Sequence, residues 1–256
     1  MKKSSIDFFV SEIIEVGVNT YQLRLFPSLE IPLNEIIPGQ FVEVLVPDKS
    51  VFLRRPISVC DIDPDNGWLD LLIAPVGPGT RSICGVSVGD CLNIILPLGN
   101  GFDQECAGVR PLLVGGGVGT APMLYFARKL SENRIQADIL LGGRTQNHIL
   151  LKKRFEAFGH LCITTDDGSL GEKGLVTAHS VWDDEHSACF VCGPTPMMKA
   201  VSAICEEKKL PCYVSLENKM ACGIGACLCC VQDTKEHGNV CVCTDGPVFL
   251  SSEIKW

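Results

Sequence analysis

The sequence lacks both the long apolar run of a membrane span and an excess of positive charge. None of its apolar stretches approaches the roughly 20 residues that a transmembrane helix needs. Asp7 and Glu12 interrupt the segment after the basic Met1-Lys2-Lys3, so no apolar core of a signal peptide forms. The formal net charge of -8 argues against nucleic acid and anionic membranes as partners. We therefore expect a cytoplasmic protein that binds neither nucleic acid nor membranes.

The chain also lacks internal repeats and low-complexity tracts. It has 256 residues, of which 46% are hydrophobic and 20% charged, and this composition excludes disorder and fits a packed globular protein. At a prior of roughly 150 residues per domain, the length suggests two units with a small third one.

Cysteine, by contrast, is abundant, with 15 residues in the chain. In a reducing cytoplasm, clustered cysteines more often hold metal or perform redox chemistry than form disulfides. Nine are scattered between Cys60 and Cys212, mostly in apolar runs, and are interpreted as small core residues. The other six gather near the C-terminus: Cys222, Cys227, Cys229, Cys230, Cys241 and Cys243.

Cys222, Cys227 and Cys230 have the spacing C-x4-C-x2-C, which is that of plant-type [2Fe–2S] sites when a further cysteine follows. Gly223 and Gly225 leave room for the loop to approach the cluster sulfurs with its N–H groups. Spacing alone leaves Cys229 as an alternative to Cys230 for the third ligand. It leaves either Cys241 or Cys243 for the fourth. A structural zinc site is the other reading, but zinc sites usually pair two short knuckles.

The pattern of elements changes twice along the chain. Residues 1–102 carry short segments rich in β-formers and bounded by turn residues, which predicts a small antiparallel barrel without helices. Residues 103–216 alternate apolar strands with helices expected at 121–132, 149–158 and 195–209, which predicts a parallel sheet with helices on both faces. Residues 217–256 are too few to bury a core unaided and need a metal centre or neighbouring domains.

Two glycine-bearing turns in the second region suggest a dinucleotide site. The first lies between an apolar strand and a helix, where backbone N–H groups and the helix dipole suit a pyrophosphate; its candidate residues are Gly115, Gly116, Gly117, Gly119 and Thr120. The second, with Cys192, Gly193 and Pro194, follows another apolar strand. Ligands bind at the carboxyl ends of such strands, so Cys192 is expected to contact one.

The barrel region holds two weaker signals. Arg54-Arg55-Pro56-Ile57-Ser58 offers a guanidinium and a hydroxyl that can reach a phosphate and a ring edge, although solvated surface arginines explain the pair equally well. Val76-Gly77-Pro78-Gly79-Thr80 is a glycine-rich turn that can donate N–H groups and a hydroxyl to a pyrophosphate.

Taken in order, these motifs resemble the ferredoxin–NADP reductase superfamily and, with the C-terminal cysteines, the electron-transfer subunits of class 1B, NAD-dependent dihydroorotate dehydrogenases. The resemblance implies an FAD-binding β-barrel, a Rossmann-like NAD domain and a small plant-type [2Fe–2S] domain. It implies Cys222, Cys227, Cys230 and Cys243 as cluster ligands. It implies the following residues for FAD: Arg55, Pro56, Ile57, Ser58, Leu72, Ile73, Ala74, Gly79 and Thr80.

By this resemblance, electrons pass from an FMN-containing dihydroorotate dehydrogenase catalytic subunit through the cluster and FAD to NAD+. The two subunits form a heterotetramer, and Cys192 lies near the flavin–nicotinamide contact.

Asp166 and Asp167 favour NAD over NADP, whereas Arg144 can meet a 2′-phosphate. One alternative is an NAD(P)H–ferredoxin oxidoreductase, a sulfide-type enzyme or a hydrogenase diaphorase subunit with the same modules. Another is a zinc-stapled nucleotide-binding regulator without redox activity.

Overall fold

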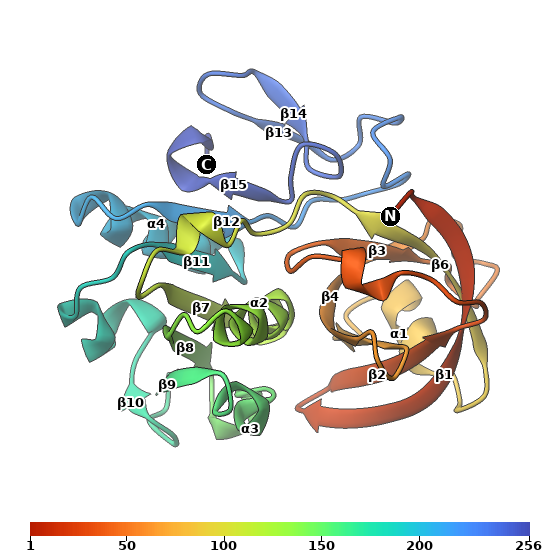
Figure 1. Ribbon diagram of the computed structural model, residues 1–256, viewed down its shortest axis with the longest axis horizontal. Coiled ribbons are helices and arrows are strands. Elements are labelled where there is room, and N and C mark those ends of the chain that lie inside the picture. The colour runs from red at the N-terminus through yellow and green to blue at the C-terminus, as the bar shows by residue number, and fades with distance from the viewer.

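Three parts of the chain lie against one another in the computed structural model, which describes residues 1–256 (Figure 1). A β-barrel occupies one side and a sheet with helices the other. The C-terminal segment, shown in blue, lies across the top of both. The two larger parts match the predicted antiparallel barrel and parallel-sheet unit.

The barrel forms because polar and apolar side chains alternate along its strands. In β1, Ile6, Phe8 and Val10 are buried while the residues between them face outward, which is the pattern of a strand with one face on a core. The six strands close in the order β1-β2-β5-β4-β3-β6. Their bounds are β1 Ser4–Gly17, β2 Thr20–Pro27, β3 Phe41–Val44, β4 Arg55–Asp63, β5 Trp68–Ile73 and β6 Cys91–Leu98.

The second part contains most of a seven-stranded sheet, ordered β10-β9-β8-β7-β11-β12-β15. Its bounds are β7 Leu112–Gly116, β8 Ala137–Gly143, β9 Gly159–Thr165, β10 Glu172–Lys173, β11 Cys189–Cys192 and β12 Cys212–Ser215, with helices α2 Thr120–Glu132, α3 Lys152–Phe155 and α4 Thr195–Glu207. All neighbours up to β12 run parallel. None of the helices combines the length and the apolar character that crossing a bilayer requires.

Both faces of the sheet are covered, as predicted. Leu113 and Phe190 pack in one hydrophobic core with α2 and Phe155 of α3. Leu112 and Val191, their neighbours along the strands, pack in a second core with α4. Because side chains alternate between the faces of a strand, these continuous apolar runs indicate strands buried on both sides.

The C-terminal segment adds a two-stranded sheet, β13 Val231–Asp233 and β14 Asn239–Cys241, and strand β15 Val248–Leu250. β15 pairs antiparallel with β12 and so extends the large sheet at its edge. Val242 and Cys243 are also buried in the core on the α4 side of the sheet. The segment therefore obtains its core from its neighbour, as its small size requires.

Two local predictions were wrong. A short helix, α1 Pro78–Cys84, follows β5 where no helix was expected. The helix predicted over 149–158 is reduced to the single turn of α3, and it cannot begin before Lys152 because Leu151 has a left-handed backbone with φ 55°.

Ion pairs join the barrel to the sheet unit. Arg128 of α2 donates to Asp61 of β4 at 2.8 Å from Nε, and Arg154 of α3 bonds both Asp61 and Asp70 of the barrel. The hydroxyl of the buried Tyr125 donates to the carbonyl of Ile36 at 2.7 Å. These contacts fix the two parts relative to each other and so hold the cavity between them in one shape.

Candidate functional site

A cavity of about 380 Å³ lies where the three parts of the chain meet. The barrel, the glycine-rich turn of the sheet unit and the C-terminal segment all contribute to its wall. Predicted site residues in the wall are Arg55, Pro56, Ile57, Ser58, Leu72, Ile73, Ala74, Thr80, Gly119 and Cys192. The two sets of candidates, proposed for different ligands, thus line one space.

Arg55 forms the polar part of the barrel wall. Its Nη1 donates to the carbonyls of Leu53 and Arg54 at 2.7 and 3.0 Å, and these bonds set the direction of the side chain. The guanidinium passes over Gly79, where a Cβ would lie only 2.5 Å from Nε of Arg55. Gly79 does not line the cavity but provides the space that Arg55 occupies. Arg54 instead donates to the carbonyls of Glu43 and Asn93 and braces the barrel.

Thr80 lies at the start of α1, on the same wall. Its hydroxyl bonds the N–H of Gly77 at 3.0 Å and the Gly77 carbonyl at 3.2 Å, which closes the first turn of the helix. The predicted glycine-rich turn is therefore the beginning of a short helix, and the hydroxyl of Thr80 is used within it.

The glycine-rich turn of the sheet unit runs from the end of β7 through a single 3-10 turn into α2. Gly117 has φ 56° and a Cβ there would meet nothing within 4 Å, so its backbone faces open space. The buried Thr120 donates its hydroxyl to the Gly117 carbonyl at 2.8 Å and tightens the turn. Backbone at the beginning of a helix and next to open space is suited to a phosphate group.

The two predicted turns touch each other. A Cβ on Gly119 would lie 2.5 Å from the carbonyl carbon of Cys192, and one on Gly116 would lie 3.4 Å from Pro194 Cδ. Gly115 faces Thr120 in the same way, at 2.9 Å from its Cγ2. Gly193 also packs on the first turn, because a Cβ there would lie 3.1 Å from the Gly116 carbonyl oxygen. Small residues thus let the ends of β7 and β11 meet at one point.

Cys192 lies at the carboxyl end of β11 and reaches the cavity. Burial raises the pKa of its thiol to about 12, against a smaller opposing effect of a Ser215 hydrogen bond. At neutral pH the group is therefore a neutral thiol rather than a nucleophilic thiolate.

The C-terminal cysteines lie in a loop with tight backbone approaches. Gly223 and Gly225 have φ 66° and 85°, and a Cβ on them would come within 2.8 Å of Glu43 Cγ and Thr244 Cγ2 respectively. The Ile224 N–H points to Cys222 Sγ at 3.5 Å, and the Cys243 N–H points to Cys230 Sγ at 3.4 Å. Burial alone disfavours the Cys222 thiolate, but backbone N–H groups of the loop outweigh it and lower its pKa to about 6.

Burial separates the six cysteines of this segment. Cys230 and Cys243 are buried, Cys222 and Cys241 are half-buried, and Cys227 and Cys229 are exposed. Thiol contacts join Cys222 to Cys227, and Cys230 to both Cys243 and Cys241. The segment thus holds more than the four thiols that the two irons of a [2Fe–2S] cluster need, with N–H donors among them, so its residues fit that group.

Several residues of the site were missed from the sequence. Ser215, Glu217 and Met220 line the cavity just beyond the end of β12, and Pro247 comes from the C-terminal segment. The rule that ligands bind at the carboxyl ends of parallel strands points to Ser215 and Glu217. No local signal marks Met220 or Pro247, because the folding of the C-terminal segment over the cavity brings them there.

Glu43 of β3 was also missed. It is fully buried, and neither of its carboxylate oxygens has a hydrogen-bond partner. It lies against the backbone of Gly223 in the cysteine loop. Burial raises the pKa of Glu43 to about 7, although the charges of Arg54 and Arg55 oppose the shift.

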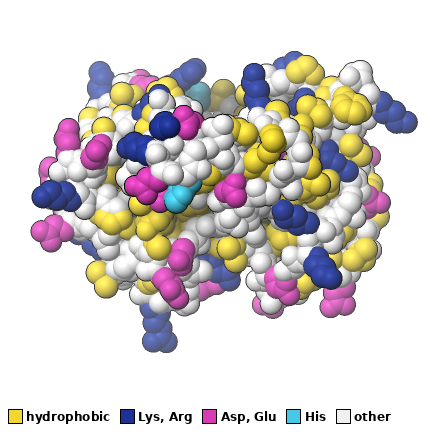
Figure 2. Space-filling view, turned by 90° about the horizontal axis from the view of Figure 1, so that it is seen from above, with side chains coloured by type: hydrophobic (Ala, Val, Ile, Leu, Met, Phe, Trp, Pro, Cys, Tyr) yellow, Lys and Arg dark blue, Asp and Glu magenta, His cyan; other side chains and the backbone are white.

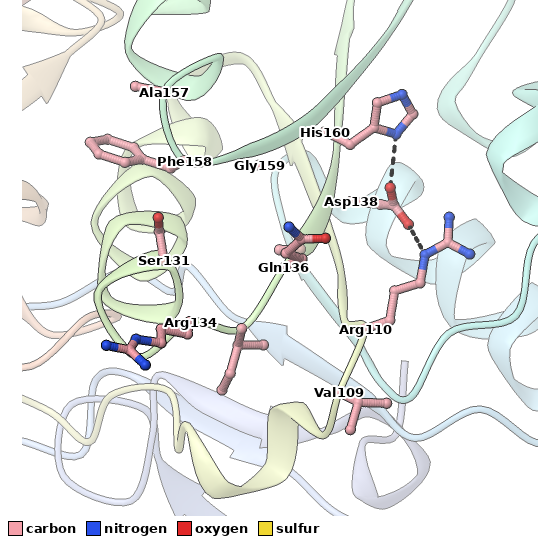
Figure 3. Close-up of a pocket in the computed structure, with 12 residues that line it drawn as sticks. Val109, Arg110, Ser131, Arg134, Gln136, Asp138, Ala157, Phe158, Gly159 and His160 are labelled. Carbon is pink, nitrogen blue, oxygen red and sulfur yellow. Dashed lines mark hydrogen bonds and ion pairs between the residues drawn. The ribbon is translucent and has the colours of Figure 1, made fainter.

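A larger cavity of about 660 Å³ lies at the amino ends of β8 and β9, away from every predicted site residue (Figure 3). The buried Asp138 bonds Arg110 at 2.8 Å and His160 at 2.8 Å there, and His186 at 3.1 Å. Burial alone would raise the pKa of Asp138, but these partners together lower it. The charged groups of this cavity therefore pair with one another within the chain, through Asp138. Arg134 lies apart from them.

The C-terminal segment lies on the upper face of the molecule, which Figure 2 shows. This face carries charges of both signs, and its hydrophobic side chains gather near the middle and toward the barrel. Ile224 and Leu228 of the cysteine loop are 50% and 65% exposed. The loop therefore presents apolar side chains to solvent next to the exposed Cys227.

Two family models match the chain. Residues 217–255 match the iron–sulfur cluster binding domain of dihydroorotate dehydrogenase B. Residues 113–203 match the oxidoreductase NAD-binding domain. The first covers the cysteine loop and the second covers both glycine-bearing turns.

Known proteins resemble the chain over nearly its full length. The electron transfer subunit of dihydroorotate dehydrogenase B (NAD(+)) from Shouchella clausii is 36% identical over 261 residues, covering 99% of each chain. That from Bacillus caldolyticus is 38% identical and covers 93% of this chain and 94% of the relative. The structure of an NADH-dependent reduced ferredoxin–NADP oxidoreductase superposes with a TM-score of 0.87 at 29% identity, covering 100% and 92% of the two chains.

Proposed function

The chain belongs to the family of electron transfer subunits of dihydroorotate dehydrogenase B, and on that premise we propose that it carries electrons from dihydroorotate oxidation to NAD+. It uses a [2Fe–2S] cluster, FAD and NAD for this purpose. Nicotinamide exchanges electrons as a hydride, a [2Fe–2S] cluster exchanges one at a time, and flavin does both.

The cavity at the junction of the three parts is the observation that carries this proposal. An electron carrier of this kind must bring a flavin, a nicotinamide and a cluster close together. The wall of the cavity combines Arg55 of the barrel, Gly119 and Cys192 of the NAD-binding region, and Met220, two residues before Cys222. One space is therefore open to the flavin and the nicotinamide, and Met220 in its wall connects it to the cysteine loop.

The chain's own residues have separate tasks in this arrangement. Arg55 holds a flavin phosphate, with Gly79 making room for its guanidinium, and Ile57 and Ser58 lie along the ring. The open backbone at Gly117 and the beginning of α2 receive the NAD pyrophosphate. Cys192, a neutral thiol, lies at the flavin–nicotinamide contact and orients the rings without transferring a proton. The exposed Asp166 and Asp167 disfavour the 2′-phosphate of NADP.

Cys222, Cys227, Cys230 and Cys243 ligate the cluster in this proposal. The buried thiols of Cys230 and Cys243 and the N–H···S contact between them support these two over Cys229 and Cys241. Cys241 is held differently, with its N–H donating to Asp245 at 2.6 Å.

The electron donor is an FMN-containing catalytic subunit that docks near the cysteine loop in a cytoplasmic heterotetramer. The exposed Ile224 and Leu228 provide apolar contact area beside the cluster ligands. Close approach at this point suits electron transfer because it places the partner next to Cys227.

The proposal is tested with the complex of this chain and its FMN-containing partner. The wild-type complex should reduce NAD+ when supplied with dihydroorotate. Cys227→Ser should abolish that reduction and the visible absorbance of the cluster while FAD stays bound. The neighbouring Cys229→Ser, equally exposed, is the matched control and should retain both.

Two results would contradict it. A cluster lost in Cys229→Ser and kept in Cys227→Ser would overturn the ligand assignment. A colourless wild-type protein, without flavin and iron–sulfur absorbance, would favour the zinc-stapled regulator.

The likeness to the NADH-dependent reduced ferredoxin–NADP oxidoreductase favours a second candidate, a subunit that exchanges electrons with ferredoxin. The same three modules serve both activities, so the donor separates them. Reduction by ferredoxin together with no response to dihydroorotate would select this alternative.

A further inference from the structure

Three cysteines outside the cavity form a compact group in the core. The sulfurs of Cys189, Cys205 and Cys212 all lie within 4.8 Å of one another, and the three residues are buried. Cys189 and Cys212 are register partners on the parallel strands β11 and β12, and Cys205 comes from α4, which packs over them. The fold thus brings together thiols that are separated by up to 23 positions in the sequence.

The spacing of these sulfurs is close to that of metal-bound thiolates. Bonds of about 2.3 Å to a tetrahedral zinc ion place two sulfurs about 3.8 Å apart. Small side-chain rotations therefore suffice to bring the three sulfurs around one ion. Cysteines that only fill space in a core can each pack as a small apolar residue, so packing alone does not require their sulfurs to lie this close together.

The group is next to a cavity of about 460 Å³ at the molecular surface. Cys205 and Cys212 form part of its wall, together with the hydroxyl residues Ser202 and Ser251. Ser202 Oγ lies 3.9 Å from Cys212 Sγ. An ion can therefore enter from this side, and a serine hydroxyl or a water from the cavity can complete its coordination.

The charges around this opening suit an anionic site. Three thiolates with a divalent ion carry one net negative charge, which is costly to bury without a cation nearby. Lys199, Lys209 and Lys235 all line the cavity. Their ammonium groups supply the compensating charge, and Glu206 is the one acidic side chain in the wall.

We propose that Cys189, Cys205 and Cys212 bind one thiophilic cation of the Zn²⁺ class, separate from the [2Fe–2S] cluster. Binding forms three metal–sulfur bonds and releases the three thiol protons to solvent, without oxidation or reduction. Soft thiolate ligands select such ions over Mg²⁺ and Ca²⁺. The site lies three residues before the cavity ends of β11 and β12, a distance of about 10 Å along the strands.

The ion fastens α4 to the sheet. Cys205 is the helix ligand, while the two strand ligands lie between β7 and the edge strand β15. An ion that binds only the folded chain stabilises it by mass action. The site is therefore structural, and its occupancy is measurable without any assay of electron transfer.

The test uses the holoprotein with FAD and cluster in place, exposed to a small excess of ZnSO₄ and then passed through a desalting column. Metal analysis should find one zinc per chain in addition to the cluster iron. Cys205→Ala should reduce this zinc at least tenfold. Cys162→Ala is the matched control, because Cys162 is buried in the same core but outside the group, and it should keep the full amount.

Flavin and cluster absorbance verify that each variant is folded. If Cys205→Ala loses them, Cys212→Ser replaces it, since serine keeps the volume but is a poor ligand for this ion. A thiolate charge-transfer band on adding Cd²⁺, present in the wild type and weakened in Cys212→Ser, gives an independent readout. The proposal is overturned if the wild type retains no zinc, if Cys205→Ala or its replacement retains as much as Cys162→Ala, or if zinc is taken up only as iron is lost.

Discussion

A buried carboxylate lies near each end of strand β4, Asp61 on the strand itself and Glu43 on its neighbour β3, and only Asp61 has hydrogen-bond partners. At the end near residue 61, Asp61 bonds Arg128 and Arg154 from the sheet unit. At the other end Glu43, the register partner of Pro56, has no partner for either oxygen. The paired end holds two parts of the chain together. The unpaired end lies next to the cysteine loop, where a buried carboxylate without hydrogen-bond partners costs stability.

The paired end should be the more sensitive of the two to mutation. Asp61→Asn takes one carboxylate from two guanidinium groups, 18% and 27% exposed, although Arg128 keeps Glu132 and Arg154 keeps Asp70. Losing a charged hydrogen bond at each guanidinium costs about 3 kcal/mol of unfolding free energy in total, at about 1.5 kcal/mol each, and urea denaturation of the holoprotein measures it. Asp65→Asn, exposed on the same hairpin, should change the free energy by less than about 0.5 kcal/mol. Equal effects of the two variants would show that the ion pairs do not join the domains.

The buried carboxyl group of Glu43 should make the unfolding free energy depend on pH. Burial raises the pKa of Glu43 to about 7 in the folded chain, whereas an unfolded glutamate ionises near pH ~4.3. The folded state therefore holds a proton that the unfolded state releases, so stability falls as pH rises from about 5 to 7. Above pH ~7 the ionised carboxylate carries the full penalty, up to about 3.7 kcal/mol at 1.36 kcal/mol per pKa unit.

Glu43→Gln removes this titration. Its unfolding free energy, relative to the wild type, should therefore rise between pH 5 and pH 8 by up to about 3 kcal/mol. Glu30→Gln, at an exposed site, is the control and should show no such trend. A difference between Glu43→Gln and wild type that stays constant with pH would mean that Glu43 is already neutralised by an unseen partner.

The two ends of β4 also differ in how far the sequence predicts them. Alternating apolar residues and glycine-rich turns are local signals, and they predicted the barrel, the sheet and part of the cavity wall, whereas Leu72, Ile73 and Ala74 of that wall followed only from the family resemblance. Glu43 resembles the outward-facing polar residue of an ordinary strand, Phe41-Val42-Glu43-Val44, but the loop at Gly223 packs against it. Likewise, the apolar pattern of the predicted helix runs through Leu151, whose left-handed backbone lies just before the start of α3. A contact between distant segments, such as that of Glu43 with Gly223, leaves no periodic trace in the sequence.

Arg55, at the Glu43 end of β4, allows an effect on ligand binding to be measured apart from an effect on stability. Its own hydrogen bonds go only to the neighbouring carbonyls of Leu53 and Arg54, so Arg55→Ala should lower the unfolding free energy by less than about 1 kcal/mol in excess FAD. Losing a charged phosphate contact should nevertheless weaken FAD retention about tenfold or more, given about 1.5–3 kcal/mol for such a hydrogen bond. Flavin content after dialysis measures it, with Arg81→Ala, exposed on α1, as the control. If both variants keep their flavin, Arg55 does not hold a flavin phosphate.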